Sequence, residues 1–238
     1  MNNKIELFKD IINTSNNIVF FGGAGVSTES GIPDFRSKDG LYNQKYDYPP
    51  ETILSHTFFM NKTEEFYKFY RDKLNSSKYQ PNITHIKLAE LENQGKLKAI
   101  VTQNIDGLHQ MAGSKNVFEL HGSVYRNYCM KCGEFYEGKF VFESKNIPYC
   151  NCGGIIKPDV VLYEEGLNEE VLTNSIKAIS SCDTLIIGGT SLTVYPASGL
   201  FHYFKGSNLI IINKASTGID NIAKLVINDN LGNVFKQI

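Results

Sequence analysis

Four cysteines lie close together in the sequence and could hold a metal ion. They follow the pattern Cys129-x2-Cys132, then 17 residues, then Cys150-x1-Cys152. Four thiolates can close a tetrahedral shell around zinc, which leaves no open position for catalysis and indicates one structural ion. A redox dithiol is the alternative, but four clustered cysteines favour zinc. We expect the fifth cysteine, Cys182, to be a small buried core residue.

A glycine-rich turn after the first apolar run could approach a phosphate. Gly22, Gly23 and Gly25 directly follow residues 18–21, and glycines there permit a tight turn close to a pyrophosphate. The dehydrogenase fingerprint GxGxxG is incomplete, because Thr28 stands at its third glycine position. Taken alone, this motif leaves an ordinary glycine-rich turn as an open alternative.

Short apolar runs rich in Ile and Val alternate with helical patterns and must position these residues. Runs without polar alternation suit strands buried on both faces. The alternation predicts an α/β fold with a Rossmann-like, doubly wound parallel sheet. The expected strands cover residues 18–21, 99–102, 117–120, 159–161, 184–187, 209–212 and 225–227, and the expected helices cover residues 5–12, 64–74, 83–92, 169–179 and 197–204.

Two stretches interrupt this alternation. Residues 37–80 carry six tyrosines and one helical run, and residues 125–156 hold the cysteine cluster. We predict that the two stretches together form a smaller inserted domain, with a helical module and a zinc ribbon. The Rossmann-like domain would then be discontinuous and comprise residues 1–36, 81–124 and 157–238.

Composition excludes several classes of protein. The 238 residues are 42% apolar and 21% charged, which is ordinary for a globular chain. The formal net charge of −1 implies no broad cationic surface and argues against a nucleic-acid partner. Glu6 and Asp10 interrupt the apolar positions near the start, so we expect no secretory leader, no membrane span and a cytoplasmic location. The sequence does not fix the oligomeric state and is compatible with a monomer.

Four longer blocks of sequence resemble the sirtuin family. They are Gly25-Val-Ser-Thr-Glu-Ser-Gly-Ile-Pro-Asp-Phe-Arg36, Thr102-Gln-Asn-Ile-Asp-Gly-Leu-His109, Glu119-Leu-His-Gly122 and Gly189-Thr-Ser-Leu-Thr-Val-Tyr-Pro196. The resemblance extends from about residue 18 to 231, nearly the whole chain. It implies an NAD-dependent protein deacetylase that acts on acetylated lysine side chains, transfers the acetyl group to ADP-ribose and releases nicotinamide.

The same resemblance implies roles for polar residues that follow two strands. His121 matches the catalytic base toward a ribose hydroxyl, a role that suits the near-neutral pKa of histidine. Asn104 and Asp106 match catalytic residues that, with Gln103, handle the nicotinamide end and its ribose. The alternatives are a structural hydrogen bond for His121 and turn formation for the other three.

Further residues match cofactor contacts of the family. Phe35 is expected to shield the reactive ribose from water, Gly189–Ser191 to contact phosphates, and Asn213 to bind a ribose. The implied NAD-binding set is Gly23, Ala24, Gly25, Ser27, Thr28, Asp34, Phe35, Arg36, Gln103, Asn104, Ile105, Asp106, His121, Gly189, Thr190, Ser191, Asn213, Lys214 and Leu231.

Val160, Val161 and Tyr163 resemble the strand that pairs with the substrate peptide, although a plain buried strand is an alternative. Glu164 stands where glycine is usual, so the substrate preference at this edge is open. Tyr67 matches an acyl-pocket residue. Sirtuins that accept acidic acyl groups carry Tyr-x-x-Arg there, whereas Tyr70 occupies the arginine position in this chain. We therefore expect acetyl groups to be preferred over succinyl or malonyl groups.

The sequence leaves three alternative functions to consider. A dehydrogenase is disfavoured by the incomplete glycine fingerprint and by the missing acidic ribose ligand. A zinc-ribbon module for nucleic acid is disfavoured by the near-neutral charge. Mono-ADP-ribosyl transfer, or removal of other lysine acyl groups, shares the first chemical step and is the nearest alternative.

Overall fold

Six strands form a central parallel sheet in the computed structural model, which describes residues 2–34 and 47–238. The order is β3-β2-β1-β7-β8-β9, and every neighbouring pair is parallel. The strands are β1 (Ile18–Gly22), β2 (Leu97–Thr102), β3 (Val117–Glu119), β7 (Thr184–Gly188), β8 (Asn208–Ile212) and β9 (Leu225–Ile227). The chain first adds β2 and β3 on one side of β1, and later adds β7, β8 and β9 on the other side. The strand order therefore reverses between β1 and β7, where open α/β sheets bind ligands.

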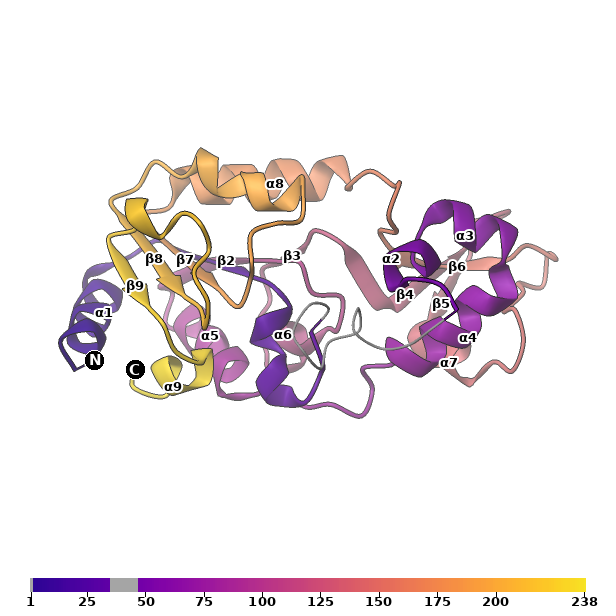
Figure 1. The fold of residues 1–238 in the computed structure, drawn as a ribbon, viewed down its shortest axis with the longest axis horizontal. Coiled ribbons are helices and arrows are strands. Elements are labelled where there is room, and N and C mark those ends of the chain that lie inside the picture. Colours follow the sequence, from indigo (N-terminus) through magenta and orange to yellow (C-terminus); the bar gives the residue numbers. More distant parts are fainter. Residues whose placement is uncertain (1, 35–46) are drawn as a thin grey trace.

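Helices cover both faces of this sheet (Figure 1). One face packs against α1 (Asn2–Thr14), α5 (Ile83–Asn93) and α9 (Leu231–Phe235). The other face packs against α8 (Glu169–Ser181) and the 3₁₀ helix Ala197–Tyr203. Consecutive residues point to opposite faces, so Phe20 joins the first core and Phe21 the second. This burial on both faces explains why the strands have few polar residues.

A smaller part of the molecule lies beside the sheet (Figure 1). Its antiparallel sheet has the order β5-β4-β6 and consists of β5 (Phe135–Glu137), β4 (Gly122–Cys129) and β6 (Ile156–Val160). Around it lie α2 (Pro50–Ile53), α3 (His56–Asn61), α4 (Thr63–Lys73) and α7 (Gly138–Glu143), which share a separate aromatic-rich core with the sheet. The short helix α6 (Leu108–Met111) follows β2 in the larger part.

The structure confirms the doubly wound parallel sheet and corrects one of its expected strands. Residues 159–161 do not join the parallel sheet, because β6 pairs antiparallel with β4. Its buried and half-exposed residues alternate, as in a strand with one face on a core. The expected helix at residues 197–204 is a 3₁₀ helix. The division into two domains stays a prediction, and the small sheet extends from Gly122 to Val160.

No helix among residues 2–34 and 47–238 has the length and apolar character that a bilayer span requires.

Candidate active site

Two glycine turns touch each other where β1 and β7 end. The amide of Gly25 donates to the carbonyl of Gly189 over 2.8 Å. A Cβ atom on Gly25 would lie 2.8 Å from the Cα of Gly189, and one on Gly189, whose φ is +61°, would lie 2.5 Å from the amide nitrogen of Val26. Only glycine fits such an approach. The sequence motif therefore forms a half-buried backbone cradle at the switch point of the sheet, where a phosphate can bind.

Asp106, Ser27 and Asn104 form a buried polar network beside this cradle. The hydroxyl of Ser27 donates to Oδ2 of Asp106 over 2.6 Å and accepts Nδ2 of Asn104 over 3.0 Å. The amide of Leu108 donates to Oδ1 of Asp106 over 2.9 Å. Burial raises the pKa of Asp106, and these two hydrogen bonds oppose that rise. The network holds a carboxylate and an amide at the carboxyl ends of β1 and β2.

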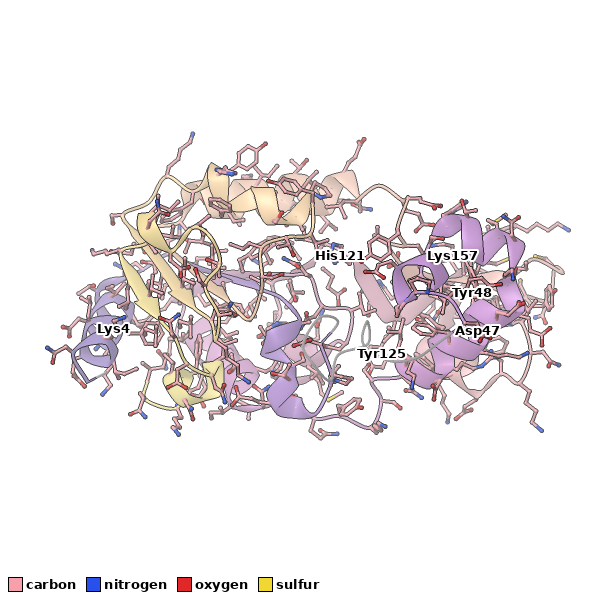
Figure 2. The ribbon with its side chains drawn as sticks, in the orientation of Figure 1. Lys4, Asp47, Tyr48, His121, Tyr125 and Lys157 are labelled. Atoms are coloured by element: carbon pink, nitrogen blue, oxygen red, sulfur yellow. The ribbon has the colours of Figure 1, made fainter. Side chains whose placement is uncertain are left out.

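His121 lies where the two parts of the molecule meet (Figure 2). Its Nδ1 lies 3.0 Å from the carbonyl oxygen of Gln103, which can only accept, so Nδ1 carries the proton. Nε2 is then the ring nitrogen that can take up a proton. Burial lowers the pKa of His121, and the bond to Gln103 opposes this. A neutral imidazole near pH 7 follows from this geometry, as a general base requires.

Gln103 connects His121, through its backbone carbonyl, with the second glycine turn, through its side chain. Its Nε2 lies 3.4 Å from the hydroxyl of Thr190, which is buried beside Gly23. The backbone amide of Gln103 donates to the carbonyl of Gly22 over 3.0 Å. The strand-end residues predicted from two distant sequence blocks thus form one continuous site.

Residues 160–165, here named the peptide edge, continue this site into the smaller part. The amide of Val161 donates to the carbonyl of His121 over 3.0 Å. The amide of Tyr163 donates to Leu54, and its carbonyl accepts the amide of His56 over 3.0 Å. Tyr163 is 40% exposed, whereas Val160 is buried. The edge therefore starts beside His121, passes Leu54 and His56, and ends in a turn in which the amide of Glu165 donates to the carbonyl of Leu162 over 3.0 Å.

The four clustered cysteines fit a metal ion. Their Sγ atoms all lie within 4.8 Å of one another, a spacing that suits four thiolates around one tetrahedral zinc. Gly133 and Gly153 have positive φ values of +76° and +79° and close the two turns. Cys182 is buried apart from this group, in the core beneath α8.

Comparison with known proteins places this geometry in a family. A model described as the Sir2 family matches residues 23–196. The chain belongs to the Sir2 family. Its relatives include an NAD-dependent protein deacetylase of Clostridium acetobutylicum, 62% identical over 99% of this chain and 98% of the relative, and one of Clostridium perfringens, 63% identical over 100% and 99%. The sirtuin resemblance seen in the sequence is confirmed.

Solved Sir2 structures share the same fold. One, described as holding a deacetylated p53 peptide and 3′-o-acetyl ADP ribose, has a TM-score of 0.91, 38% identity and coverage of 98% of this chain and 96% of that one. Another, with p53 peptide and NAD⁺, has a TM-score of 0.88, 38% identity and the same coverage. The strand order of its own sheet and the similarity to solved Sir2 structures both show that this sirtuin has a Rossmann-like architecture.

Other predicted cofactor residues of this sirtuin lie around the cradle. Thr28 donates its hydroxyl to the carbonyl of Gly25, and Ala24 opens the 3₁₀ turn after Gly23. The carbonyl of Ile105 accepts the amide of Val124. Ser191 is exposed and bonds to Thr193. Half-buried Asp34 ends the first described segment; Phe35 and Arg36 lie outside the described residues.

The adenosine-side candidates lie at the ends of β8 and β9. Asn213 pairs its amide with the carbonyl of Ile227 and donates Nδ2 to Ala215 over 2.8 Å. Leu231 is the first residue of α9 and is buried. It packs against Gly188, since a Cβ atom on Gly188 would lie 2.7 Å from Cδ2 of Leu231. Lys214 is exposed. The contacts of these three residues with the cofactor stay a prediction.

The structure does not bring Tyr67 to the cleft of this sirtuin. The side chain is fully buried in the aromatic core around α4, and its hydroxyl donates to the carbonyl of Ile156. Burial also raises the pKa of the Tyr67 hydroxyl well above its ordinary value. In this arrangement the hydroxyl is used inside the small core.

Two supports of the site were not found from the sequence. Tyr125 packs on Gly107 and shares a 3.1 Å bond with Ser76, which itself donates to the carbonyl of Asp106. Arg126 reaches Glu119 at 2.6 Å, and so ties β4 to the strand that leads to His121. The only sequence signal was the rarity of arginine, with three in the chain.

Proposed function

We propose that this sirtuin is an NAD-dependent protein-lysine deacetylase. The observation that carries the proposal is the fixed ring of His121, whose Nδ1 is held by the carbonyl of Gln103 while its backbone carbonyl accepts the amide of Val161 of the peptide edge. The curated relatives at 62% and 63% identity bear the same name. The reaction transfers the acetyl group of acetyl-lysine to ADP-ribose and releases nicotinamide.

Different residues of the chain bind the cofactor, accept the proton and bind the peptide. The glycines of the cradle, which have no side chains, let the pyrophosphate approach the backbone closely. The network of Ser27, Asn104 and Asp106 holds hydroxyl and carboxamide groups of the nicotinamide end. Bound NAD supplies an electrophilic ribose carbon and a leaving group. His121 takes a proton from a ribose hydroxyl at Nε2. The peptide edge supplies main-chain partners for an extended acetylated peptide.

Zinc is assigned a structural role, held by the four clustered cysteines. Four protein ligands leave no position for substrate, and the site belongs to the small sheet. Zinc-binding thiols persist in a reducing compartment, which supports a cytoplasmic location.

Product analysis tests the proposed function. Purified protein is incubated with NAD and an acetyl-lysine peptide, and the products are identified by mass spectrometry. Free lysine peptide, nicotinamide and acetyl-ADP-ribose in equal amounts are expected. A peptide or protein that gains ADP-ribose while the acetyl group stays in place would instead support mono-ADP-ribosyl transfer.

A further inference from the structure

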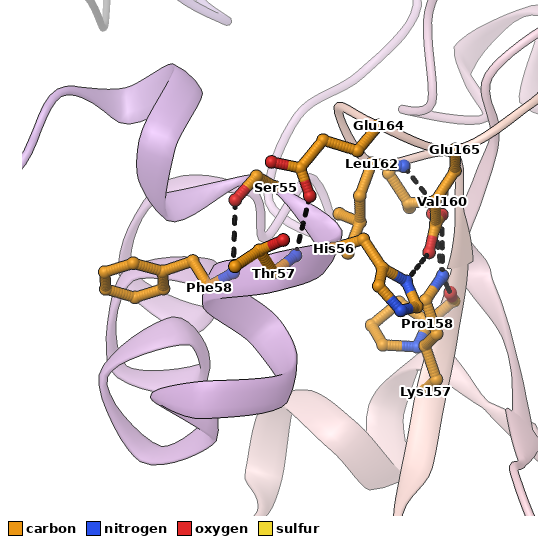
Figure 3. Close-up of polar contacts among 10 residues, drawn as sticks. All are labelled: Ser55, His56, Thr57, Phe58, Lys157, Pro158, Val160, Leu162, Glu164 and Glu165. Carbon is orange, nitrogen blue, oxygen red and sulfur yellow. Dashed lines mark hydrogen bonds and ion pairs between the residues drawn. The ribbon is translucent and has the colours of Figure 1, made fainter.

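The first three amide groups of α3 all have acceptors, and two of these belong to the peptide edge. Figure 3 shows the bonds of the second and third amides, from Thr57 and Phe58. The amide of His56 donates to the carbonyl of Tyr163 over 3.0 Å, and that of Thr57 donates to Oε2 of Glu164 over 2.9 Å. The hydroxyl of Ser55 accepts the third, from Phe58. A helix leaves its first amides without internal partners. Six-residue α3 therefore depends on the peptide edge for its start.

Glu164 makes this contact from an unfavourable backbone conformation. Its φ is +75°, and within the described segments only Leu192 shares a positive φ among residues other than glycine. Side chains with a Cβ atom rarely adopt this region, which persists where surrounding contacts enforce it. The bond to Thr57 is such a contact, and it also lowers the pKa of Glu164. The carboxylate is therefore charged at neutral pH.

The neighbouring Glu165 anchors the peptide edge on its other side. Its carboxylate bonds to Lys157 at 3.0 Å, to His56 at 2.9 Å and to the amide of Leu162 at 2.9 Å. Lys157 lies on β6 and His56 on α3, so this anchor ties the edge to both elements. Loss of the Glu164 contact would leave the edge attached to β6 and bonded to α3 through His56 alone.

We propose that Glu164 is a positioning residue for the acetylated peptide, which acts by holding the peptide edge against α3. The inference rests on the proposed function, because it takes the edge as the place where substrate pairs. A peptide strand pairs best with a backbone that is already held in a fixed shape. Glu164 is exposed and outside the glycine cradle, so it influences peptide affinity and leaves NAD binding and the chemical step unchanged.

Three substitutions separate the contact from the backbone conformation. Glu164→Ala removes the acceptor and keeps the strained φ. Glu164→Gly also removes the acceptor but relieves the strain. Glu164→Gln keeps an oxygen that can accept the amide of Thr57. Glu143→Ala, at an exposed residue of α7 in the same part of the molecule, is the matched control.

Peptide affinity is measured by calorimetry with an acetyl-lysine peptide, alongside KM for peptide, KM for NAD and kcat. Loss of the contact is expected to weaken peptide binding about three- to tenfold in the Ala and Gly variants. The Gln and control variants should stay within about twofold, as should KM for NAD and kcat in all four. The Gly variant should melt at a higher temperature than the Ala variant.

Unchanged peptide affinity in the Ala and Gly variants would overturn the inference, as would a Gln variant that is as weak as Ala. Failure of the unsubstituted protein to bind the peptide would overturn it too. Binding without deacetylation would count against the proposed function alone, since the affinities of the variants still decide the role of Glu164.

Discussion

The hydroxyl of Ser27 donates to Oδ2 of Asp106 over 2.6 Å and so links the glycine cradle to the loop after β2. The two residues are 79 positions apart. Both are buried, and the same hydroxyl accepts Asn104. One serine oxygen therefore satisfies two side chains that we assign to the nicotinamide end.

Ser27→Ala should weaken NAD binding and lower stability. Removal of the hydroxyl takes a partner from Oδ2 of a buried carboxylate and from the buried amide of Asn104, a loss of about 1–3 kcal/mol in the free energy of unfolding. Urea unfolding and KM for NAD measure the two effects. Ser181→Ala, at an exposed helix end, is the control. A variant indistinguishable from this control would show that the network has no energetic role.

His121→Ala should keep the fold and lose about 10²–10⁴-fold in turnover, the usual contribution of a general base. The ring makes one bond to a backbone carbonyl, so little of the core depends on it. Because burial lowers the pKa of His121 below 6.5, the rate of the unsubstituted enzyme should rise with pH to a plateau below neutrality. Deacetylation assays from pH 5 to 8 check both points. Turnover of the variant within about twofold would remove His121 from its assigned role.

Freshly purified, reduced protein should contain one zinc. Chelation should unfold the small sheet, because zinc binding is coupled to local folding. Elemental analysis and circular dichroism measure this, and Cys132→Ser should lower the zinc content. Cys182→Ser is the matched control, since this thiol lies in a different core; its zinc content should equal that of the unsubstituted protein. Zinc-free protein would contradict the site.

Two buried histidines should make stability fall in acid. His85 and His109 have ring centroids 4.8 Å apart, and neither ring nitrogen of His109 has a partner among the described residues. Burial lowers the pKa of His85 to about 4 and that of His109 well below its usual value. Above pH 6.5 both are neutral in the folded and unfolded chain. Between 6.5 and about 4 only the unfolded chain takes up these protons, so stability falls as the pH falls.

Urea unfolding at pH 7.5, 5.5 and 4.5 measures this dependence. His109→Phe removes one titrating ring, so the slope of stability against pH should decrease by up to about 1.4 kcal/mol per pH unit below 6.5. Equal slopes for the variant and the unsubstituted protein would refute the assignment. Stability at pH 7.5 should change little, since an aromatic ring of similar size replaces an unpaired imidazole.

The sequence predicts the central sheet well because strands buried on both faces leave long apolar signals. It predicts the small sheet poorly. β4 mixes polar and apolar residues from Gly122 to Cys129. The predicted strand at residues 159–161 includes only the last two residues of β6, whose partner is antiparallel. The short helix α3 depends on the distant acceptors Tyr163 and Glu164, which no local pattern reveals.

The site likewise has some residues that the sequence predicts and others that it does not. Residue types and spacing identified His121, the glycine cradle and the cysteine cluster, because each needs a particular residue in a short motif. The supports could not be found this way. Arg126 on β4 forms an ion pair with Glu119 on β3. The side chain of Tyr67 packs in the small core. Both contacts depend on tertiary packing, which the sequence pattern does not show.

Acetyl-lysine should be preferred over succinyl-lysine by about tenfold or more, because an unpaired buried carboxylate is costly. The two cations near Tyr67 are engaged elsewhere. Arg71 donates to Ser144 at 3.1 Å and to the carbonyl of Asn146 at 3.0 Å, and Lys68 pairs with Glu64 at the surface. Tyr70, at the position where an arginine would be needed, is fully buried and stacks on Phe142.

Matched peptides carrying acetyl, butyryl or succinyl lysine decide this point. Butyryl and succinyl chains both contain four carbons, so any difference between their kcat/KM values reports charge and not length. Arg71→Ala should leave the ratio of succinyl to acetyl turnover unchanged, since this guanidinium is bound to Ser144 and Asn146. Succinyl turnover equal to acetyl turnover would show that a cation reaches the acyl pocket after all, and loss of that activity in the Arg71 variant would identify it.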